Sequence, residues 1–200
     1  RRHTRYGTVT GVQTCALPIS AGDVAELRTQ TGAGLMDCKK ALQESNGDYN
    51  QALEYLRKKG QKVAEKRADK AATEGCVVTA LNSDKTTGVV LALCCETDFV
   101  AKNEAFTDLA SRLVKLALDN KVETVDQLNA LTIDGVTVAD KLVEQTGKTG
   151  EKIVVSELHQ LKGDKLSSYI HAGSKIGVLL AFKDGGKSGS DEFFRGVAMH

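Results

Sequence analysis

The chain has 200 residues, 41% of them hydrophobic, which is enough for one large domain or two smaller ones with a packed core. Its 27 basic and 26 acidic residues give a formal net charge of +1. This balance argues against a nucleic-acid-binding surface as the main function, because neutralising phosphates needs a local basic excess. No apolar run approaches the ~18–20 residues that span a bilayer, so no membrane partner is expected.

Residues 1–19 show neither helical nor strand periodicity, and they contain the single proline, Pro18. They do not match a signal peptide, because no sustained apolar stretch follows the leading basic residues. The stretch VTGVQTCALPI resembles the in-frame translation of a common sequencing-library adapter. We therefore interpret residues 1–19 as a disordered, adapter-derived segment; the alternative is a natural disordered extension.

Residues 20–60 are predicted to form three short helices. The first two cover about 22–30 and 35–45, and in the second Leu35 belongs to an apolar stripe with Cys38 and Leu42. Asp48 is expected to cap the third helix and Gly60 to end it. Links this short favour a compact three-helix unit of ubiquitin-associated shape.

The Ala-rich, charged stretch 61–74 is predicted to be an exposed linker helix. Its cations could form a basic patch, but Glu65 and Asp69 lie among them, and a solvated face is the simpler interpretation. The cations in question are Lys62, Lys66, Arg67 and Lys70.

From Gly75 the apolar pattern changes to that of strands, and residues 75–200 are predicted to form a core domain. The runs 76–83 and 88–95 indicate an antiparallel hairpin. Further along, helices are expected over about 103–118, 136–145 and 191–200, and strands over 152–161 and 167–182. Strands that follow helices without regular alternation are typical of an α+β fold. The predicted architecture is thus a three-helix unit, a linker helix and an antiparallel sheet with packed helices.

The five cysteines form no C-x-x-C pair and the four histidines lie far apart, so no metal site and no cofactor are expected. We interpret the cysteines as reduced thiols, and Cys94 and Cys95 should point to opposite faces of a strand. His159 and His171 have no Ser or Cys partner nearby in the sequence, which gives no sign of nucleophilic catalysis.

Two segments come close to a phosphate-binding loop, residues 142–149 and 181–188, which both end in Gly-Lys-Ser/Thr. Each lacks the first glycine, the residue that lets the backbone wrap the phosphates, and carries Leu142 or Ala181 instead. Surface turns explain both better. A nucleotide-binding enzyme fragment using Lys187 stays an alternative, as does a simple helical adaptor.

Three longer segments carry a family resemblance: LRTQTGAGLMDCKKAL at 27–42, LCCETDFVAK at 93–102 and SYIHAGSKIGVLLA at 168–181. In this order and spacing they resemble the elongation factor Ts family, and the resemblance covers about residues 21–200. Ala92 and Cys94 depart from the Glu and Asn usual in the family. The resemblance also implies a C-terminal truncation, without the second half of the core and the helical dimerisation elements.

The resemblance implies a cytoplasmic guanine nucleotide exchange factor and not an enzyme. Its expected partner is the GTPase elongation factor Tu, whose GDP it would release during translation by disturbing the Mg²⁺ and phosphate site. Four residues at one strand-to-helix junction are implied in that step: Thr97, Asp98, Phe99 and Val100. Further partner-binding residues implied by the resemblance are Arg28, Leu35, Met36, Lys39 and His171.

The residues alone leave other interpretations open. Thr97 and Asp98 are expected to cap the turn that follows the strand, which would leave Phe99 at an exposed junction. Phe99 could instead enter its own core, Leu35 could equally be a core residue, and Lys39 could be an ordinary solvent-facing charge.

Overall fold

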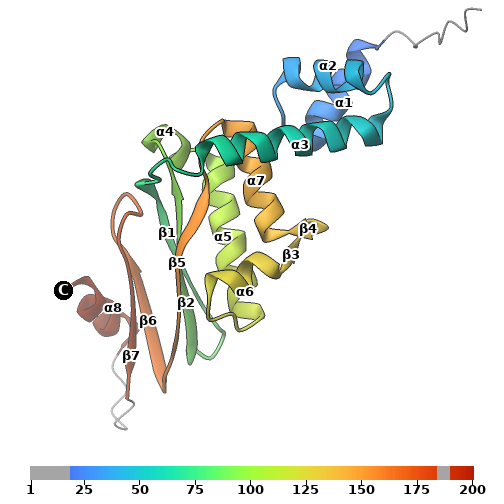
Figure 1. The fold of residues 1–200 in the computed structure, drawn as a ribbon. Coiled ribbons are helices and arrows are strands. Elements are labelled where there is room, and N and C mark those ends of the chain that lie inside the picture. The colour runs from blue at the N-terminus through green and yellow to red at the C-terminus, as the bar shows by residue number, and fades with distance from the viewer. Residues whose placement is uncertain (1–18, 184–189) are drawn as a thin grey trace, which may run out of the picture. The chain divides into compact units, whose positions relative to one another are not determined.

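The computed structural model describes residues 19–183 and 190–200 (Figure 1). These residues form two compact units, with the boundary between Leu56 and Arg57. Helices come first and antiparallel strands with packed helices follow, which confirms the predicted α+β class. No helix in these described ranges is both long enough and apolar enough to cross a bilayer.

The first unit contains α1 (Ala21–Thr31), α2 (Leu35–Glu44) and the start of α3 (Tyr49–Arg67). Ser20 begins α1 with a capping box, in which its hydroxyl accepts from the Asp23 amide and the Asp23 carboxylate accepts from the Ser20 amide. Gly32, with φ of 65°, ends α1 in the left-handed conformation that glycine adopts without strain. The core of this unit consists of Val24, Leu27, Cys38, Ala41, Leu42 and Ala52.

Ile19 is partly buried and packs against this helical core. The prediction that Ile19 is disordered is therefore wrong, because its side chain packs within the folded unit. Its origin from an adapter stays a prediction. The rest of that assignment concerns residues 1–18, which lie outside the described residues.

The predicted end of the third helix at Gly60 is also wrong, since α3 continues to Arg67. Gly60 is buried against α7 (Val138–Thr149), where an added Cβ would lie 3.4 Å from the Val143 carbonyl oxygen. At Gly147 an added Cβ would lie only 2.8 Å from the Gly60 Cα. Gly60 thus serves close approach of two helix backbones and not helix termination.

The linker helix predicted over 61–74 is helical only as far as Arg67, and it is not a separate helix. Residues 61–67 are the continuation of α3, and β1 (Glu74–Leu81) already begins at Glu74. Helical periodicity cannot mark this end, because the stretch has little apolar face on which to read one.

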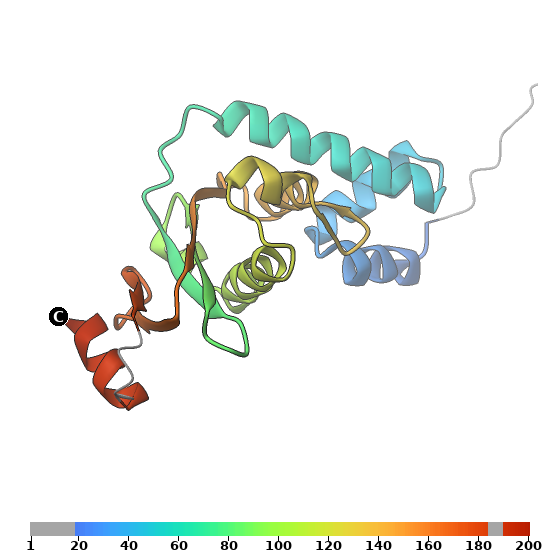
Figure 2. The ribbon, with the colours of Figure 1, turned by 90° about the horizontal axis from the view of Figure 1, so that it is seen from below.

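The second unit is built on a three-stranded antiparallel sheet of order β1–β2–β5, with β2 (Thr87–Cys95) in the centre and β5 (Val154–Lys162) on one side. The hairpin predicted from 76–83 and 88–95 is confirmed as β1 and β2, with Cys76 opposite Leu93. Alternate residues of β2 are fully buried under α5 (Glu104–Asp119), which covers one face of the sheet (Figures 1 and 2). Cys95 is buried on this side and Cys94 is not, as their adjacency predicted.

The opposite face of the sheet carries a second hairpin, β6 (Lys165–Ile170) and β7 (Gly177–Phe182), with α8 (Asp191–Met199) outside it (Figure 2). The single strand predicted over 167–182 is therefore wrong. Gly173, with φ of 84°, and Ser174, with φ of 54°, turn the chain back in its middle. The β6–β7 hairpin joins the main sheet where the Val77 amide donates to the Ser174 carbonyl oxygen at 2.7 Å.

The remaining elements connect the layers. They are α4 (Asp98–Ala101), α6 (Val125–Ala130), β3 (Thr132–Ile133) and β4 (Val136–Thr137). The helix predicted from residue 136 begins at Val138, because Thr137 is its N-cap and accepts a hydrogen bond from the Asp140 amide. Strands β3 and β4 and helix α6 were not predicted.

Candidate partner-binding site

The segment Thr97–Val100 lies at the end of β2, where the chain leaves the sheet and forms the four-residue helix α4. Thr97 stands at the N-cap position, yet its side chain does not cap α4, contrary to the sequence expectation. Its hydroxyl instead donates to Glu151 Oε1 at 2.7 Å, and its amide donates to Glu151 Oε2 at 3.0 Å. Thr97 is thus held by a residue that follows α7 and not by its own helix.

Asp98 forms an ion pair with Lys102 one turn later, with 2.7 Å between Oδ2 and Nζ. The hydrogen bond from Lys102 and its charge hold the pKa of the Asp98 carboxyl below its usual value, and the charge of Lys175 adds to this. Asp98 is consequently an exposed anion in the first turn of α4, where a negative charge is favoured.

Phe99 is 83% exposed, although the buried end of β2 at Cys95 lies only four residues before it. The neighbouring Val100 is partly buried and packs against the main core of the second unit. The interpretation of Phe99 as a core residue is therefore wrong. α4 places its valine against the protein and its phenylalanine in solvent, so the ring is available to another molecule.

The tip of the β6–β7 hairpin presents His171 to solvent. The Tyr169 hydroxyl lies 3.1 Å from His171 Nδ1, and the two rings meet edge to face. Nearby, Ile176 is 59% exposed. Lys175 bonds Glu74 at 2.8 Å, and this bond, with a smaller contribution from the charge of Asp98, raises the pKa of Lys175. His171 therefore lies on an exposed hairpin tip, and the charge of Asp98 in α4 acts on Lys175 of the same tip.

The other implied contacts lie on the first unit. Leu35 is 53% exposed and Met36 is 71% exposed at the start of α2, and Arg28 and Lys39 are also exposed. Leu35, the first residue of α2, does not continue the buried stripe of Cys38 and Leu42. All four side chains, two apolar and two basic, are thus exposed on the first unit.

Of the two segments suspected of nucleotide binding, the first does not form a phosphate loop. Residues 142–149 lie within α7, where the backbone amides bond within the helix, and Lys148 pairs with Glu144 at 2.6 Å. Of the second segment, residues 184–189 lie outside the described residues, and with them Lys187. Among residues 19–183 and 190–200, no cluster of three or more His, Cys, Asp or Glu could hold a metal ion.

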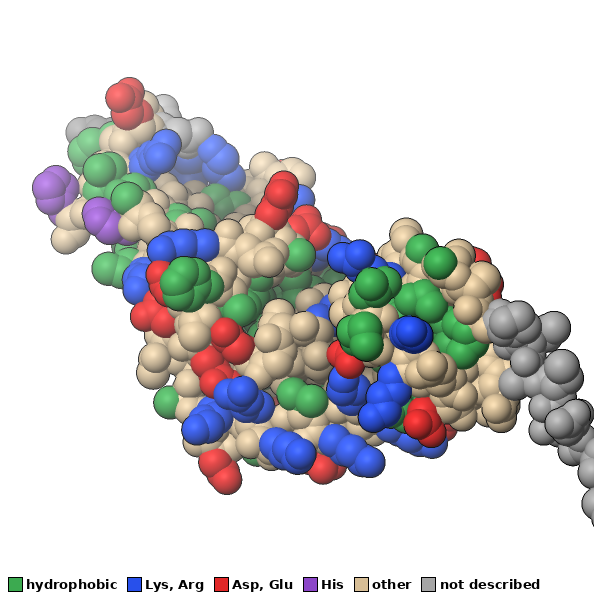
Figure 3. All heavy atoms as spheres, turned by 90° about the horizontal axis from the view of Figure 1, so that it is seen from above, with side chains coloured by type: hydrophobic (Ala, Val, Ile, Leu, Met, Phe, Trp, Pro, Cys, Tyr) green, Lys and Arg blue, Asp and Glu red, His purple; other side chains and the backbone are tan. Residues whose placement is uncertain are grey.

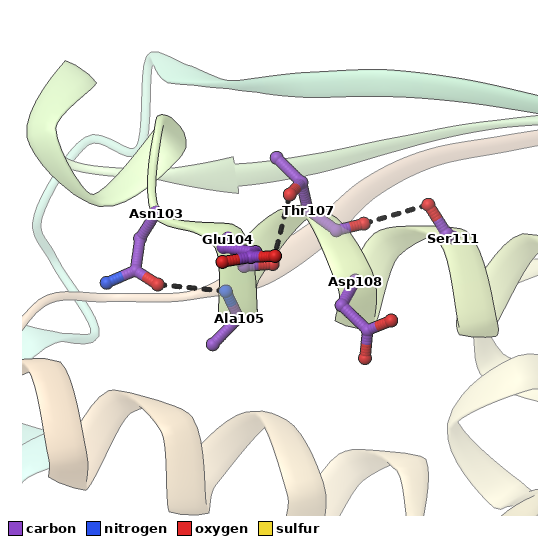
Figure 4. A pocket seen from close by; sticks show the side chains of 6 residues that line it. All are labelled: Asn103, Glu104, Ala105, Thr107, Asp108 and Ser111. Atoms are coloured by element: carbon purple, nitrogen blue, oxygen red, sulfur yellow. Dashed lines mark hydrogen bonds between the residues drawn. The ribbon is translucent and has the colours of Figure 1, made fainter.

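Two surface features indicate no ligand. A hollow at the start of α5 is lined by Asn103, Glu104, Ala105, Thr107, Asp108 and Ser111 (Figure 4). Some of its polar atoms bond within the same helix: Asn103 Oδ1 accepts from the Ala105 amide, and the Ser111 hydroxyl donates to the Thr107 carbonyl oxygen. On the face drawn in Figure 3, basic and acidic side chains lie interspersed, and a pure basic patch is not visible there.

The sequence analysis did not single out two residues that bond at the base of α4, Glu96 and Glu151. Each is a single acidic residue in a charged, turn-rich context, and no spacing relates them, since 54 positions separate Thr97 from Glu151. Only the pairing of β2 with β5 brings these segments together.

Comparison with known proteins supports the family suggested by the motifs. The family model described as "Elongation factor TS" matches residues 96–200, more than half of the chain. A protein named elongation factor Ts from Rhodopirellula baltica is 59% identical over 182 residues, which is 91% of this chain and 55% of that relative. Relatives of the same name from Flavobacterium psychrophilum and Christiangramia forsetii are 51% and 46% identical, over 90% of this chain and 65% of their own lengths. The chain thus spans between half and two thirds of the length of these relatives.

Proposed function

Since this chain belongs to the elongation factor Ts family, we propose that it releases GDP from elongation factor Tu during translation elongation. The observation that carries the proposal is Phe99, an 83% exposed aromatic ring on a four-residue helix at the end of a buried strand. The proposed role of this ring is a wedge that enters the partner GTPase near its Mg²⁺ site.

The energy available from such a ring is of the right size. Burying an aromatic side chain of ~150–250 Å² at ~25 cal/mol/Å² contributes roughly 4–6 kcal/mol before costs. Because about 1.4 kcal/mol corresponds to a tenfold change, this could weaken nucleotide binding by about 10³–10⁴. An exposed ion pair contributes only ~0–1 kcal/mol and could not do the same.

The proposed mechanism needs no chemistry by this chain. Mg²⁺ in nucleotide sites is held mainly by waters and phosphate oxygens with few protein ligands, so a small shift of those ligands releases it. Coupling between two ligands of one protein is reciprocal. If the exchange factor weakens the binding of GDP to the GTPase, GDP weakens the binding of the exchange factor to the GTPase by the same factor. Rebinding of nucleotide, in the cell mostly GTP, then displaces the exchange factor.

The other residues receive supporting roles in this proposal. Asp98 orients the turn, and Thr97 and Val100 hold α4 on the sheet. His171 is proposed to contact the partner GTPase as well. Arg28, Leu35, Met36 and Lys39 bind a second region of the GTPase. As a partner of a translation factor, the protein would work in the cytoplasm, without a cofactor of its own.

The test is stopped-flow release of fluorescent GDP from elongation factor Tu, made with the full-length protein. Phe99→Ala should slow the release at least tenfold, because the wedge is lost, while the thermal midpoint should hardly move. Phe193→Ala removes another exposed phenylalanine, on α8, and should release GDP at the normal rate. Normal release by Phe99→Ala would refute the wedge, and no release by the unmodified protein would refute the function.

A further inference from the structure

Two segments that lie far apart in the sequence bond each other reciprocally at the base of α4. Glu151 accepts hydrogen bonds from the amide and the hydroxyl of Thr97, at 3.0 and 2.7 Å. In return, Glu96 Oε1 accepts the amide hydrogen of Lys152 at 2.7 Å. We name this arrangement, made by Glu96, Thr97, Glu151 and Lys152, the carboxylate clamp.

The backbone and the side chain of Thr97 are both fixed by hydrogen bonds. Besides the two bonds to Glu151, the Thr97 carbonyl oxygen accepts from Cys95 Sγ at 3.1 Å and from the Ala101 amide at 3.2 Å. All three polar groups of Thr97 are therefore engaged. Hydrogen bonds to an ionised carboxylate are about twice as strong as neutral ones, so the two bonds to Glu151 dominate this anchorage.

Helix α4 depends on this anchorage more than an ordinary helix does. It has only four residues, none of them fully buried, and no side chain caps its start. Such a short helix has little stability of its own, and its contribution to the core is limited to the partly buried Val100 and Ala101. Together with this packing, the bonds of Thr97, the residue immediately before α4, fix the direction in which the helix points.

The clamp is itself tied to the rest of the second unit. Glu96 Oε2 accepts from Arg67 Nη1 at 2.8 Å, and the Glu96 side chain is only 15% exposed. The Lys152 ammonium donates to the carbonyl oxygens of Ala68 and Lys70, at 2.6 and 3.2 Å, just beyond the end of α3. Movement of the clamp would therefore disturb several bonds together, which makes it a rigid base.

We propose that Glu151 is a positioning residue for nucleotide exchange, which fixes α4 so that Phe99 points at the partner before the two proteins meet. This inference rests on the proposed function of Phe99. A wedge fixed in advance loses little conformational entropy on binding, and its displacement by even ~1 Å can cost up to 10²-fold in rate.

The experiment measures release of fluorescent GDP against the concentration of the full-length exchange factor, which separates the saturating rate constant from the half-saturating concentration. Glu151→Ala and Thr97→Val should each lower the saturating rate constant about tenfold, because the start of α4 is no longer fixed and Phe99 shifts from its position. Glu151→Gln should restore most of the rate, since its amide can accept from the Thr97 N–H and donate to the Thr97 hydroxyl. Thr97→Ser keeps both donors and should behave likewise.

Two further variants keep the result specific. Asp140→Ala removes a similar threonine–carboxylate bond, to Thr137 at the start of α7 (2.9 Å), and should leave the saturating rate constant unchanged. The double variant Glu151→Ala/Phe99→Ala should be no slower than Phe99→Ala alone, because both changes remove the same wedge. All rates are measured well below each thermal midpoint, and Thr97→Val carries the test if Glu151→Ala does not fold.

The outcomes separate the inference from the proposed function. A normal saturating rate constant for Glu151→Ala and Thr97→Val, with slow release by Phe99→Ala, overturns the inference and leaves the function intact. Multiplicative losses in the double variant also overturn it, because Glu151 would then act independently of Phe99. Normal release by Phe99→Ala overturns both.

Discussion

Helices α4 and α5 follow one another in the chain and both face the same sheet, yet they are held in different ways. In α5 Phe106 is 5% exposed and belongs to a row of buried apolar side chains, whereas in α4 Phe99 is 83% exposed. α5 stays in place by apolar burial, and α4 by hydrogen bonds at its base together with the packing of Val100. The difference leaves the Phe99 ring exposed to another protein.

The strongest test of this comparison is a pair of matched truncations. Phe106→Ala should lower the free energy of unfolding by about 3–5 kcal/mol, because it removes a buried ring and leaves a cavity. Phe99→Ala should change it by less than about 0.5 kcal/mol, as a surface substitution does. Urea titration of both variants measures the two values. Similar losses for the two would mean that Phe99 is buried in solution and that the contrast is false.

The core around α5 could be predicted from the sequence, because burial imposes a local pattern. The apolar runs 76–83 and 88–95 predicted the hairpin of β1 and β2, and the apolar positions within 103–118 predicted α5. Where two glycines serve packing between helices, as at Gly60, the same local signs led to a wrong helix end. A glycine in the sequence can either end a helix or allow two helix backbones to approach closely, and the residue type alone does not distinguish the two.

The base of α4 could not be predicted. The carboxylate clamp depends on which strands pair, and hydrogen bonds across the sheet leave no periodicity in the sequence. The position of Phe99 after a strand was visible, but its exposure was not, because an apolar residue at such a junction fits a core equally well. Motif resemblance supplied the prediction there, and the structure adds the physical reason for it.

A second prediction extends the comparison to a helix held by close backbone approach. Gly147→Ala should lower the free energy of unfolding by about 1–3 kcal/mol, because the new Cβ would lie 2.8 Å from the Gly60 Cα and push α3 from α7. In an open helix the same change stabilises by about 1 kcal/mol. Gly196→Ala on α8 meets no neighbour within 4 Å and is the matched control for calorimetry. A stabilised Gly147→Ala would show that the two helices can separate without cost.

A third prediction concerns Cys95, which lies between the two regions, buried under α5 while its Sγ donates to Thr97. Burial, and then the charge of Glu151, raises the pKa of the Cys95 thiol to about 11, and burial also raises that of Cys76 to about 11. The unfolded chain releases these protons near pH 9, so it binds fewer protons than the folded protein above that pH. Stability from this source is complete below about pH 9 and declines as the pH rises towards 11.

Denaturant titrations between pH 8 and 11 measure that decline. Cys95→Ala and Cys76→Ala should each flatten the slope of unfolding free energy against pH, whatever their effect at neutral pH. Val89→Ala removes a buried side chain without a thiol, and it should keep the slope. An unchanged slope in both cysteine variants would mean that water reaches these thiols, and that the base of α4 is less closed than described.

The smallest effect is expected at Asp98, on the exposed side of α4. Lys102 keeps the pKa of this carboxyl below its usual value near 3.8, so its contribution to stability is present above that pH and is lost as the pH falls through the lower value in the folded protein. Asp98→Asn should therefore change the unfolding free energy little at neutral pH and flatten its dependence on pH only below about 3.8. Acid titration followed by circular dichroism measures this.

The rate of GDP release with Asp98→Asn should lie between the rates with the unmodified protein and with Phe99→Ala, because the substitution loosens the turn and keeps the ring. If it slowed release as much as Phe99→Ala, the charge and not the ring would act on the partner.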